Sequence, residues 1–132
     1  MIIVNLKPNP LRTNSYIPDD PTFLISGIVN WRLTVQPNVW RPPTDVFETE
    51  ENFVVRVEIA GMRDSDFSIT LDKQVLNISG IRPEFSEQKA FHQMEIHFGE
   101  FVSEVEIPSP VDPDRVEAVY QDGFLRVNLP KA

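Results

Sequence analysis

From Arg41 onward, the sequence takes on a period of two in its apolar and polar residues, and this pattern limits the possible folds more than any other feature. The alternating apolar rows include Phe53-Val55-Val57-Ile59, Phe67-Ile69-Leu71 and Leu76-Ile78. Successive side chains of a strand point to opposite faces of a sheet, so such a row predicts a strand with one face on a core. The short spacing of these rows, with turn residues between them, predicts an all-β domain over residues 41–132.

Two turns between apolar rows predict hairpins. Asp72-Lys73-Gln74 separates the second row from the third, and Asp122-Gly123 joins predicted strands at 116–121 and 124–129. A two-residue Asp-Gly connection requires positive φ, which glycine adopts readily and which costs a residue with a Cβ about 1–2 kcal/mol. Gly123 is therefore predicted to serve the turn.

Between the two hairpins, residues 82–95 lose the alternation. They are polar apart from Phe85, Phe91 and Met94, which predicts a long loop. Fourteen residues without regular structure are unusual in a compact domain unless the loop has a role. A strand is expected to start at Ile96, with a bend at Gly99 or Glu100 where the parity of the apolar residues changes.

The region before the domain has a different composition. Seven of the twelve prolines lie within the first 43 residues, which excludes a long helix or a central strand there. Residues 1–40 are therefore predicted to form an arm. Its apolar side chains are expected to bind client proteins or, alternatively, only to pack between subunits; they are Phe23, Leu24, Ile25, Ile28, Trp31 and Leu33.

Charge and composition exclude several partners. The formal net charge is -8, and residues 41–132 carry 18 acidic and 9 basic groups. Such an acidic domain would repel phosphate backbones, so we expect no nucleic-acid partner. No apolar run reaches the roughly 20 residues of a membrane span, and the apolar run at the start is too short for a secretory signal, so none is expected there. The chain has no cysteine, which is in keeping with a cytoplasmic location.

Residues suited to catalysis or metal binding do not cluster. His92 and His97 are five apart and are expected on opposite sides of one strand, too far apart for a ligand pair. No G-x-S-x-G and no phosphate-binding G-x-x-x-x-G-K occurs. The acidic residues stand at alternating positions typical of a solvated surface. We therefore expect neither an enzyme nor a cofactor or metal site.

The last hairpin carries a family resemblance. The stretch from Ala118 to Leu125, AVYQDGFL, resembles the A-x-x-x-N-G-x-L signature of α-crystallin domains, with Asp122 and Gly123 at the turn. Further similarities are WRPPTDV at 40–46, VEIAGM at 57–62, GEF at 99–101 and IP at 107–108. Over about 90 of its 132 residues the chain resembles the small heat shock proteins.

The resemblance implies an immunoglobulin-like antiparallel β-sandwich that works as a homodimer and assembles into larger homo-oligomers. It implies that the loop at 82–95, with Phe85, Phe91 and Met94, adds a strand to residues 41–47 of the partner. It also implies a docking groove, whose residues would alternatively be ordinary core; these are Ile69, Leu71, Val116 and Ala118.

Two departures from the family pattern stand out. Ser103 occupies a position where the family commonly has arginine, so an interface charge is missing. The family usually continues after the last strand with an I-x-I/V tail that docks in the groove, and none stands before Ala132. Either a tail is missing from the sequence or another segment serves assembly. Ile2-Ile3-Val4, with Leu6 in phase, could dock there or be a simple apolar terminus.

The function implied is that of an ATP-independent holdase, which binds partly unfolded client proteins and prevents their aggregation under stress. A holdase needs apolar surface and no catalytic set. The alternative is a binding module on the same sandwich, such as a co-chaperone resembling the p23 family, which would recognise one folded partner.

Overall fold

The fold is described from a computed structural model, which describes residues 1–7, 39–85 and 87–132. These residues form eight strands and two short 3-10 helices. The strands are β1 (Ile2–Ile3), β2 (Thr44–Glu48), β3 (Asn52–Glu58), β4 (Phe67–Asp72), β5 (Val75–Arg82), β6 (Gly99–Glu106), β7 (Glu117–Gln121) and β8 (Phe124–Pro130). The 3-10 helices are η1 (Asp64–Asp66) and η2 (Pro113–Arg115).

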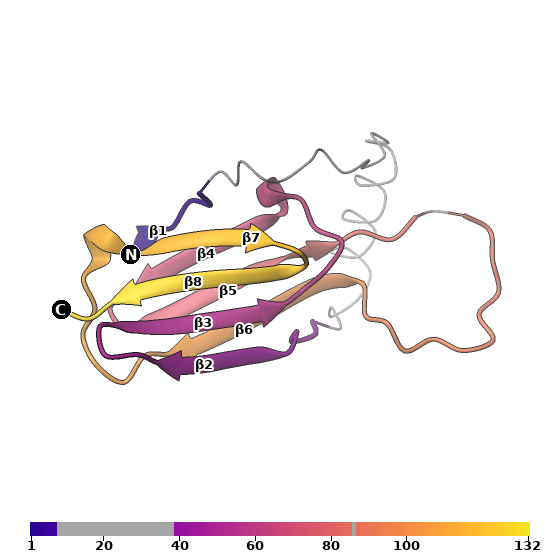
Figure 1. Cartoon of the computed structure of the whole chain (residues 1–132). Coiled ribbons are helices and arrows are strands. Elements are labelled where there is room, and N and C mark those ends of the chain that lie inside the picture. Colours follow the sequence, from indigo (N-terminus) through magenta and orange to yellow (C-terminus); the bar gives the residue numbers. More distant parts are fainter. Residues whose placement is uncertain (8–38, 86) are drawn as a thin grey trace.

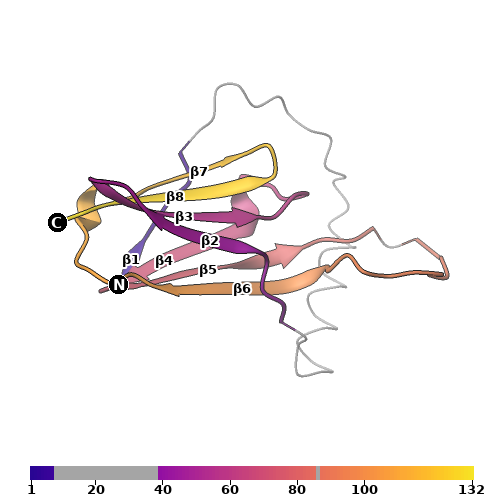
Figure 2. The same cartoon turned by 60° about the horizontal axis from the view of Figure 1, so that its bottom comes forward.

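The strands form two four-stranded sheets that pack face to face (Figures 1 and 2). One sheet has the order β1-β4-β5-β6 and the other β2-β3-β8-β7. Every strand pair is antiparallel. The predicted all-β antiparallel sandwich is therefore confirmed.

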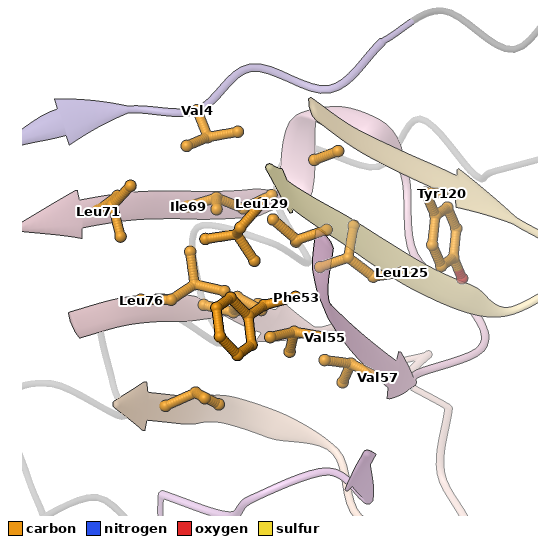
Figure 3. Close-up of a cluster of buried hydrophobic side chains, with 14 of the residues drawn as sticks. Val4, Phe53, Val55, Val57, Ile69, Leu71, Leu76, Tyr120, Leu125 and Leu129 are labelled. Atoms are coloured by element: carbon orange, nitrogen blue, oxygen red, sulfur yellow. The ribbon is translucent and has the colours of Figure 1, made fainter. Parts of the chain in front are cut away.

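The apolar rows of the sequence meet between the two sheets and form the core. Figure 3 shows side chains from β3, β4, β5 and β8 gathered there. Residues with no measurable exposure include Val55, Val57, Leu76, Ile78, Phe101, Leu125, Val127 and Leu129. Burial of these side chains, each worth about 1.5–3 kcal/mol relative to exposure, is the main stabilising term of the fold.

One polar side chain is fully buried in this layer among the described residues. The Ser103 hydroxyl lies 2.8 Å from Oγ1 of Thr44, whose own hydroxyl donates to the Pro42 carbonyl at 2.9 Å. Since the single proton of Thr44 is committed to Pro42, Ser103 is the donor of the pair. The position expected to lack an interface charge instead carries a hydrogen bond between β6 and β2.

Both predicted hairpins are present. Asp122 and Gly123 have φ values of 52° and 82°, which gives the expected two-residue turn between β7 and β8. Lys73, in the turn between β4 and β5, has a φ of 57°. The residues predicted to form the two turns thus connect both strand pairs in the structure.

The prediction that a strand starts at Ile96 is wrong, because β6 begins at Gly99. The β5–β6 ladder ends at the pair Arg82 and Gly99, so the loop runs over residues 83–98 instead of 82–95. Among the residues that the structure describes, no strand pairs with residues 96–98, and Ile96 is 65% exposed. A φ of 92° at Gly99 is in keeping with the bend expected there.

The chain enters the sandwich through a short parallel contact at Trp40. The Trp40 amide donates to the Glu100 carbonyl at 3.2 Å, and the Val102 amide donates to the Trp40 carbonyl at 3.0 Å. Residue 40 therefore extends the β6 edge before the chain crosses to β2 in the other sheet.

The division into an arm of residues 1–40 and a domain of 41–132 stays a prediction. Within the part of the chain described, no helix is long and apolar enough to cross a membrane.

Candidate functional site

The long loop (residues 83–98, with residue 86 outside the described part) reaches away from the end of the sandwich (Figures 1 and 2). Its apolar side chains are open to solvent: Phe85 is 60%, Phe91 51%, Met94 61% and Ile96 65% exposed. Three of these are the loop residues singled out from the sequence, and Ile96 was missed because it was assigned to a strand. Four large apolar side chains on one protruding segment form a surface suited to contact with another chain.

Both ends of the loop are held together at its base. Arg82 donates from Nε to the His97 carbonyl at 2.7 Å, and from Nη2 to the same oxygen. Its guanidinium lies over the Trp40 ring, 4.6 Å from the centroid, and over that of Phe98 at 5.2 Å. Partial burial lowers the pKa of Arg82 from its ordinary value. The cluster fixes where the loop leaves the sandwich.

The two histidines lie in this loop and not on a strand, which corrects the expectation from the sequence. His97 stacks on Trp40, with ring centroids 5.2 Å apart. Within residues 1–7, 39–85 and 87–132, no group of three or more His, Cys, Asp and Glu side chains could hold a metal ion.

Among residues 1–7, 39–85 and 87–132, strand β2 pairs only with β3 and so forms an edge of its sheet. Just outside β2, Glu58 N–H donates to the Pro43 carbonyl at 3.0 Å, and Thr49 N–H donates to the Asn52 carbonyl at 2.8 Å. Hydrogen-bonded residues alternate along an antiparallel strand, so within β2 the residues bonded to β3 are Asp45 and Phe47. In an antiparallel pair, alternate residues direct their N–H and C=O groups away from the neighbour. Val46 is such a residue, and its side chain is 45% exposed. An unpaired edge of this kind can accept a strand from another chain.

The opposite side of the sandwich has a seam between β4 of one sheet and the edge strand β7 of the other. We call the four predicted groove residues the β4–β7 seam; Ile69, Leu71 and Ala118 are buried, and Val116 is half-buried against the core. The leading segment (residues 1–7) lies along the seam, crossing from one layer to the other (Figure 2). Ile2-Ile3-Val4 thus lies on the seam of its own chain, and a role of this segment in assembly stays a prediction.

Backbone pairing and side chains both hold the leading segment. Val4 N–H donates to Ile69 at 2.9 Å, and Lys7 N–H donates to Ala118 at 2.7 Å. Val4 is only 8% exposed and points into the core toward Ile69 (Figure 3). The apolar residues at every second position marked this segment in the sequence, but they did not indicate that the segment packs on the sandwich of the same chain.

The residues of the signature hairpin have structural roles. Ala118 and Leu125 are fully buried, and the Gly123 carbonyl accepts a hydrogen bond from Ile59 N–H at 2.8 Å. A Cβ at Gly123 would lie 3.3 Å from that of Ala60, where the chain passes closely. The predicted arm residues lie outside the described part of the chain: Phe23, Leu24, Ile25, Ile28, Trp31 and Leu33.

Comparison with known proteins places these features in a family. The model of the Hsp20/alpha crystallin family matches residues 45–132. Heat shock protein 16 of Schizosaccharomyces pombe is 34% identical over 121 residues, which cover 86% of this chain and 85% of that protein. Small heat shock protein C2 of Rickettsia felis is 32% identical over 92 residues, covering 68% of this chain and 60% of that relative's length.

Solved structures show the same sandwich. Heat shock protein 16.0 from Schizosaccharomyces pombe matches with a TM-score of 0.64 and 33% identity, over 70% of this chain and 87% of that one. The hspA structure from Xanthomonas axonopodis matches with a TM-score of 0.64 and 29% identity, over 70% of this chain and 94% of that one. The matched family model covers the strands from β2 to β8, the long loop and the signature hairpin, and the chain therefore belongs to the Hsp20/α-crystallin family of small heat shock proteins.

Proposed function

We propose that the protein is an ATP-independent holdase, which binds partly unfolded proteins and prevents their aggregation under stress. Family membership supports a chaperone role, and the match of the Hsp20/alpha crystallin model to residues 45–132 is the observation that carries the proposal. The surface for clients would come from the apolar residues of the predicted arm, because the exposed side chains of the long loop would be covered in the dimer proposed below. Binding by apolar burial is non-directional and so tolerates clients of many shapes.

The charge of the domain fits this function. Residues 41–132 have 9 basic and 18 acidic groups, a net charge of -9, whereas residues 1–40 have 3 basic and 2 acidic groups. Net charge opposes self-association, so the acidic sandwich would keep a loaded complex in solution. The proposed activity needs no catalytic group or cofactor. The lack of cysteine in all 132 residues is in keeping with a chaperone that acts in the reducing cytoplasm.

The direct test is aggregation of a heat-labile protein, followed by light scattering without nucleotide. The full chain is expected to suppress the scattering at a stoichiometric ratio. A variant with serine at Phe23, Ile28 and Trp31 tests the predicted arm residues, and Ser26→Ala with Asn30→Ala is the matched control in the same stretch. Unchanged aggregation with the full chain would instead favour a module that recognises a single folded partner.

We also propose that the working unit is a homodimer in which the long loop of each subunit pairs with β2 of the other. The loop has four exposed apolar side chains, and β2 has an open edge with the half-exposed Val46 beside it. A strand from the partner would cover both surfaces at once, which a single chain does not do. Such an exchange is isologous and closes as a two-fold dimer.

Loop substitutions test the exchange. Serine at Phe91, Met94 and Ile96 removes the apolar contacts but no backbone group, so we expect a lower mass by light scattering coupled to size exclusion. Gln88→Ser and Gln93→Ser form the control, since they change the same loop without removing apolar surface. A triple variant with the same mass as the unmodified chain would exclude these contacts from the dimer.

A further inference from the structure

Trp40 contacts the residues at both ends of the long loop. The guanidinium of Arg82, the last residue of β5, lies over its ring at 4.6 Å from the centroid. The same ring stacks on His97 near the other end of the loop, with centroids 5.2 Å apart and planes at 19°. Nε1 of Trp40 donates to the carbonyl of Gly99, the first residue of β6, at 3.4 Å. One side chain thus links the start of the loop to its end.

Trp40 is also the residue through which the chain enters the sandwich. Its backbone N–H and C=O groups bond to β6, and its ring packs on the buried Phe101 with centroids 5.8 Å apart. Trp40 is half-buried, whereas the preceding Val39 is 43% exposed. The sandwich therefore fixes the ring, and the ring in turn fixes both ends of the loop.

Beyond its base, the loop has few attachments to its own sandwich. Among the described residues, the hydrogen bonds, ion pairs and ring contacts that join the loop to the sandwich all involve Trp40 or Arg82. The contacts of Lys89 with Glu84 and Phe91 lie within the loop itself. The direction in which the loop leaves the sandwich thus depends on Trp40 and Arg82.

Arg82 is oriented by rings and a carbonyl group. In the part of the chain that the structure describes, it forms no ion pair, although residues 41–132 have 18 acidic groups. Its guanidinium lies over the rings of Trp40 and Phe98 and donates twice to the His97 carbonyl. A planar guanidinium can stack on a ring and donate in a fixed fork at the same time, which an ammonium group cannot do. Loss of the Trp40 ring would remove one of the two rings that orient this fork.

A fixed direction of the loop favours pairing with a second chain. A segment that is already held in its bound geometry loses less conformational freedom on binding than a free segment. Release of the loop ends would let Phe91, Met94 and Ile96 take many positions relative to β2 of a partner. The exchange would then cost more entropy, and the dimer would dissociate more readily.

We propose that Trp40 is a positioning residue for loop exchange: by holding both ends of the loop against β6, it sets the strength of the dimer. The inference rests on the proposed loop-exchanged homodimer. Because Trp40 is the last residue of the predicted arm, it also ties the strength of the dimer to the point where the arm joins the sandwich.

Substitution of Trp40 in the full chain tests this role. Trp40→Ala should raise the dissociation constant of the dimer about tenfold, measured by light scattering on a dilution series, because the loop is no longer held in its bound geometry. Trp40→Phe keeps a ring beside Arg82 and should have a smaller effect. Equal dissociation constants for the unmodified chain and Trp40→Ala would overturn the proposal.

The matched control is Val111→Ala. Val111 is 8% exposed and bridges to Lys131 beside the C-terminus, and that end of the sandwich lies opposite the loop (Figure 1). This substitution also removes packed apolar atoms, but it should leave the dissociation constant unchanged. A control that weakens the dimer as much as Trp40→Ala would show that loss of packing anywhere has this effect, and would contradict the proposal.

Hydrogen exchange separates positioning from a general loss of stability. In Trp40→Ala, exchange should rise by a larger factor for the amides of residues 87–98 and of Val46 than for those of β3 and β8, since the loop and the β2 edge open locally. An equal factor in all these segments would mean that Trp40 only stabilises the sandwich, and would overturn the proposal.

Arg82 provides an internal check. Arg82→Lys keeps the charge but loses the fork, and its combination with Trp40→Ala should weaken the dimer by much less than the product of the two single effects, because both act on one contact. Effects that multiply would contradict the proposal. An unmodified chain that is a monomer at every concentration would fail the proposed dimer itself, whereas a dimer that is insensitive to Trp40→Ala would fail this inference alone.

Discussion

The core and the long loop contain the same kinds of side chain in opposite environments. Phe101 and Leu125 have no exposed surface, whereas Phe91 and Met94 are 51% and 61% exposed. The difference lies in the surroundings: the core residues lie between the two sheets, whereas no strand among the described residues pairs with the loop. Apolar character alone therefore does not decide burial. Position between the two sheets decides it, and we propose that another chain covers the loop.

The largest expected effect comes from a cavity in the core. Leu125→Ala should lower the free energy of unfolding by about 2–5 kcal/mol, because Leu125 is fully buried. Urea denaturation followed by circular dichroism measures it. Met94→Ala in the loop is the matched control, and its effect should depend on protein concentration while that of Leu125→Ala should not. If both variants lost a similar free energy of unfolding, independent of protein concentration, core and loop would not differ in the way described above.

Gly80 tests the packing at the point where β5 approaches the loop. A Cβ there would lie 2.4 Å from the Asp66 carbonyl oxygen and 2.9 Å from Cζ of Phe101. Gly80→Ala should therefore destabilise the fold by about 1–3 kcal/mol through overpacking. Thermal unfolding measures the loss, and Ser79→Ala, one residue earlier, is the control. A neutral Gly80→Ala would show that this corner is looser than the core.

Ser103 tests whether the buried hydroxyl stabilises the junction of the two sheets. Ser103→Ala should cost about 0.5–1.5 kcal/mol, the usual net value of one hydrogen bond. A double-mutant cycle with Thr44→Val in urea isolates the pair, whose oxygens are 2.8 Å apart. Additive effects of the two substitutions would mean that the bond contributes nothing.

The smallest effect is expected on the surface. Nζ of Lys131 lies 2.6 Å from Oε2 of Glu48, and their side chains are 29% and 55% exposed. Glu48→Gln should change the free energy of unfolding by less than about 1 kcal/mol, because water screens exposed ion pairs. A loss as large as that of Leu125→Ala in the same urea assay would contradict the view that the core dominates stability.

The sequence predicted what depends on local rules. The alternation from Phe53 onward indicated the strands, and Asp122-Gly123 indicated its turn, because both follow from backbone geometry within a few residues. The end of the loop was misplaced, because the alternation at Ile96 is the same whether or not a partner strand exists. The docking of Val4 on Ile69 joins residues far apart in sequence, so no local pattern could place it on its own domain.

The most direct test of the proposed chain-to-chain pairing is at Val46, whose N–H faces the open edge of β2. Proline at this position removes the backbone N–H group that points away from β3, and it leaves the hydrogen bonds between β2 and β3 in place. Edge strands tolerate proline. We expect light scattering coupled to size exclusion to give at least a dimer for the unmodified chain and for Val46→Ala, and a monomer for Val46→Pro. A Val46→Pro variant with the mass of the unmodified chain would contradict the account.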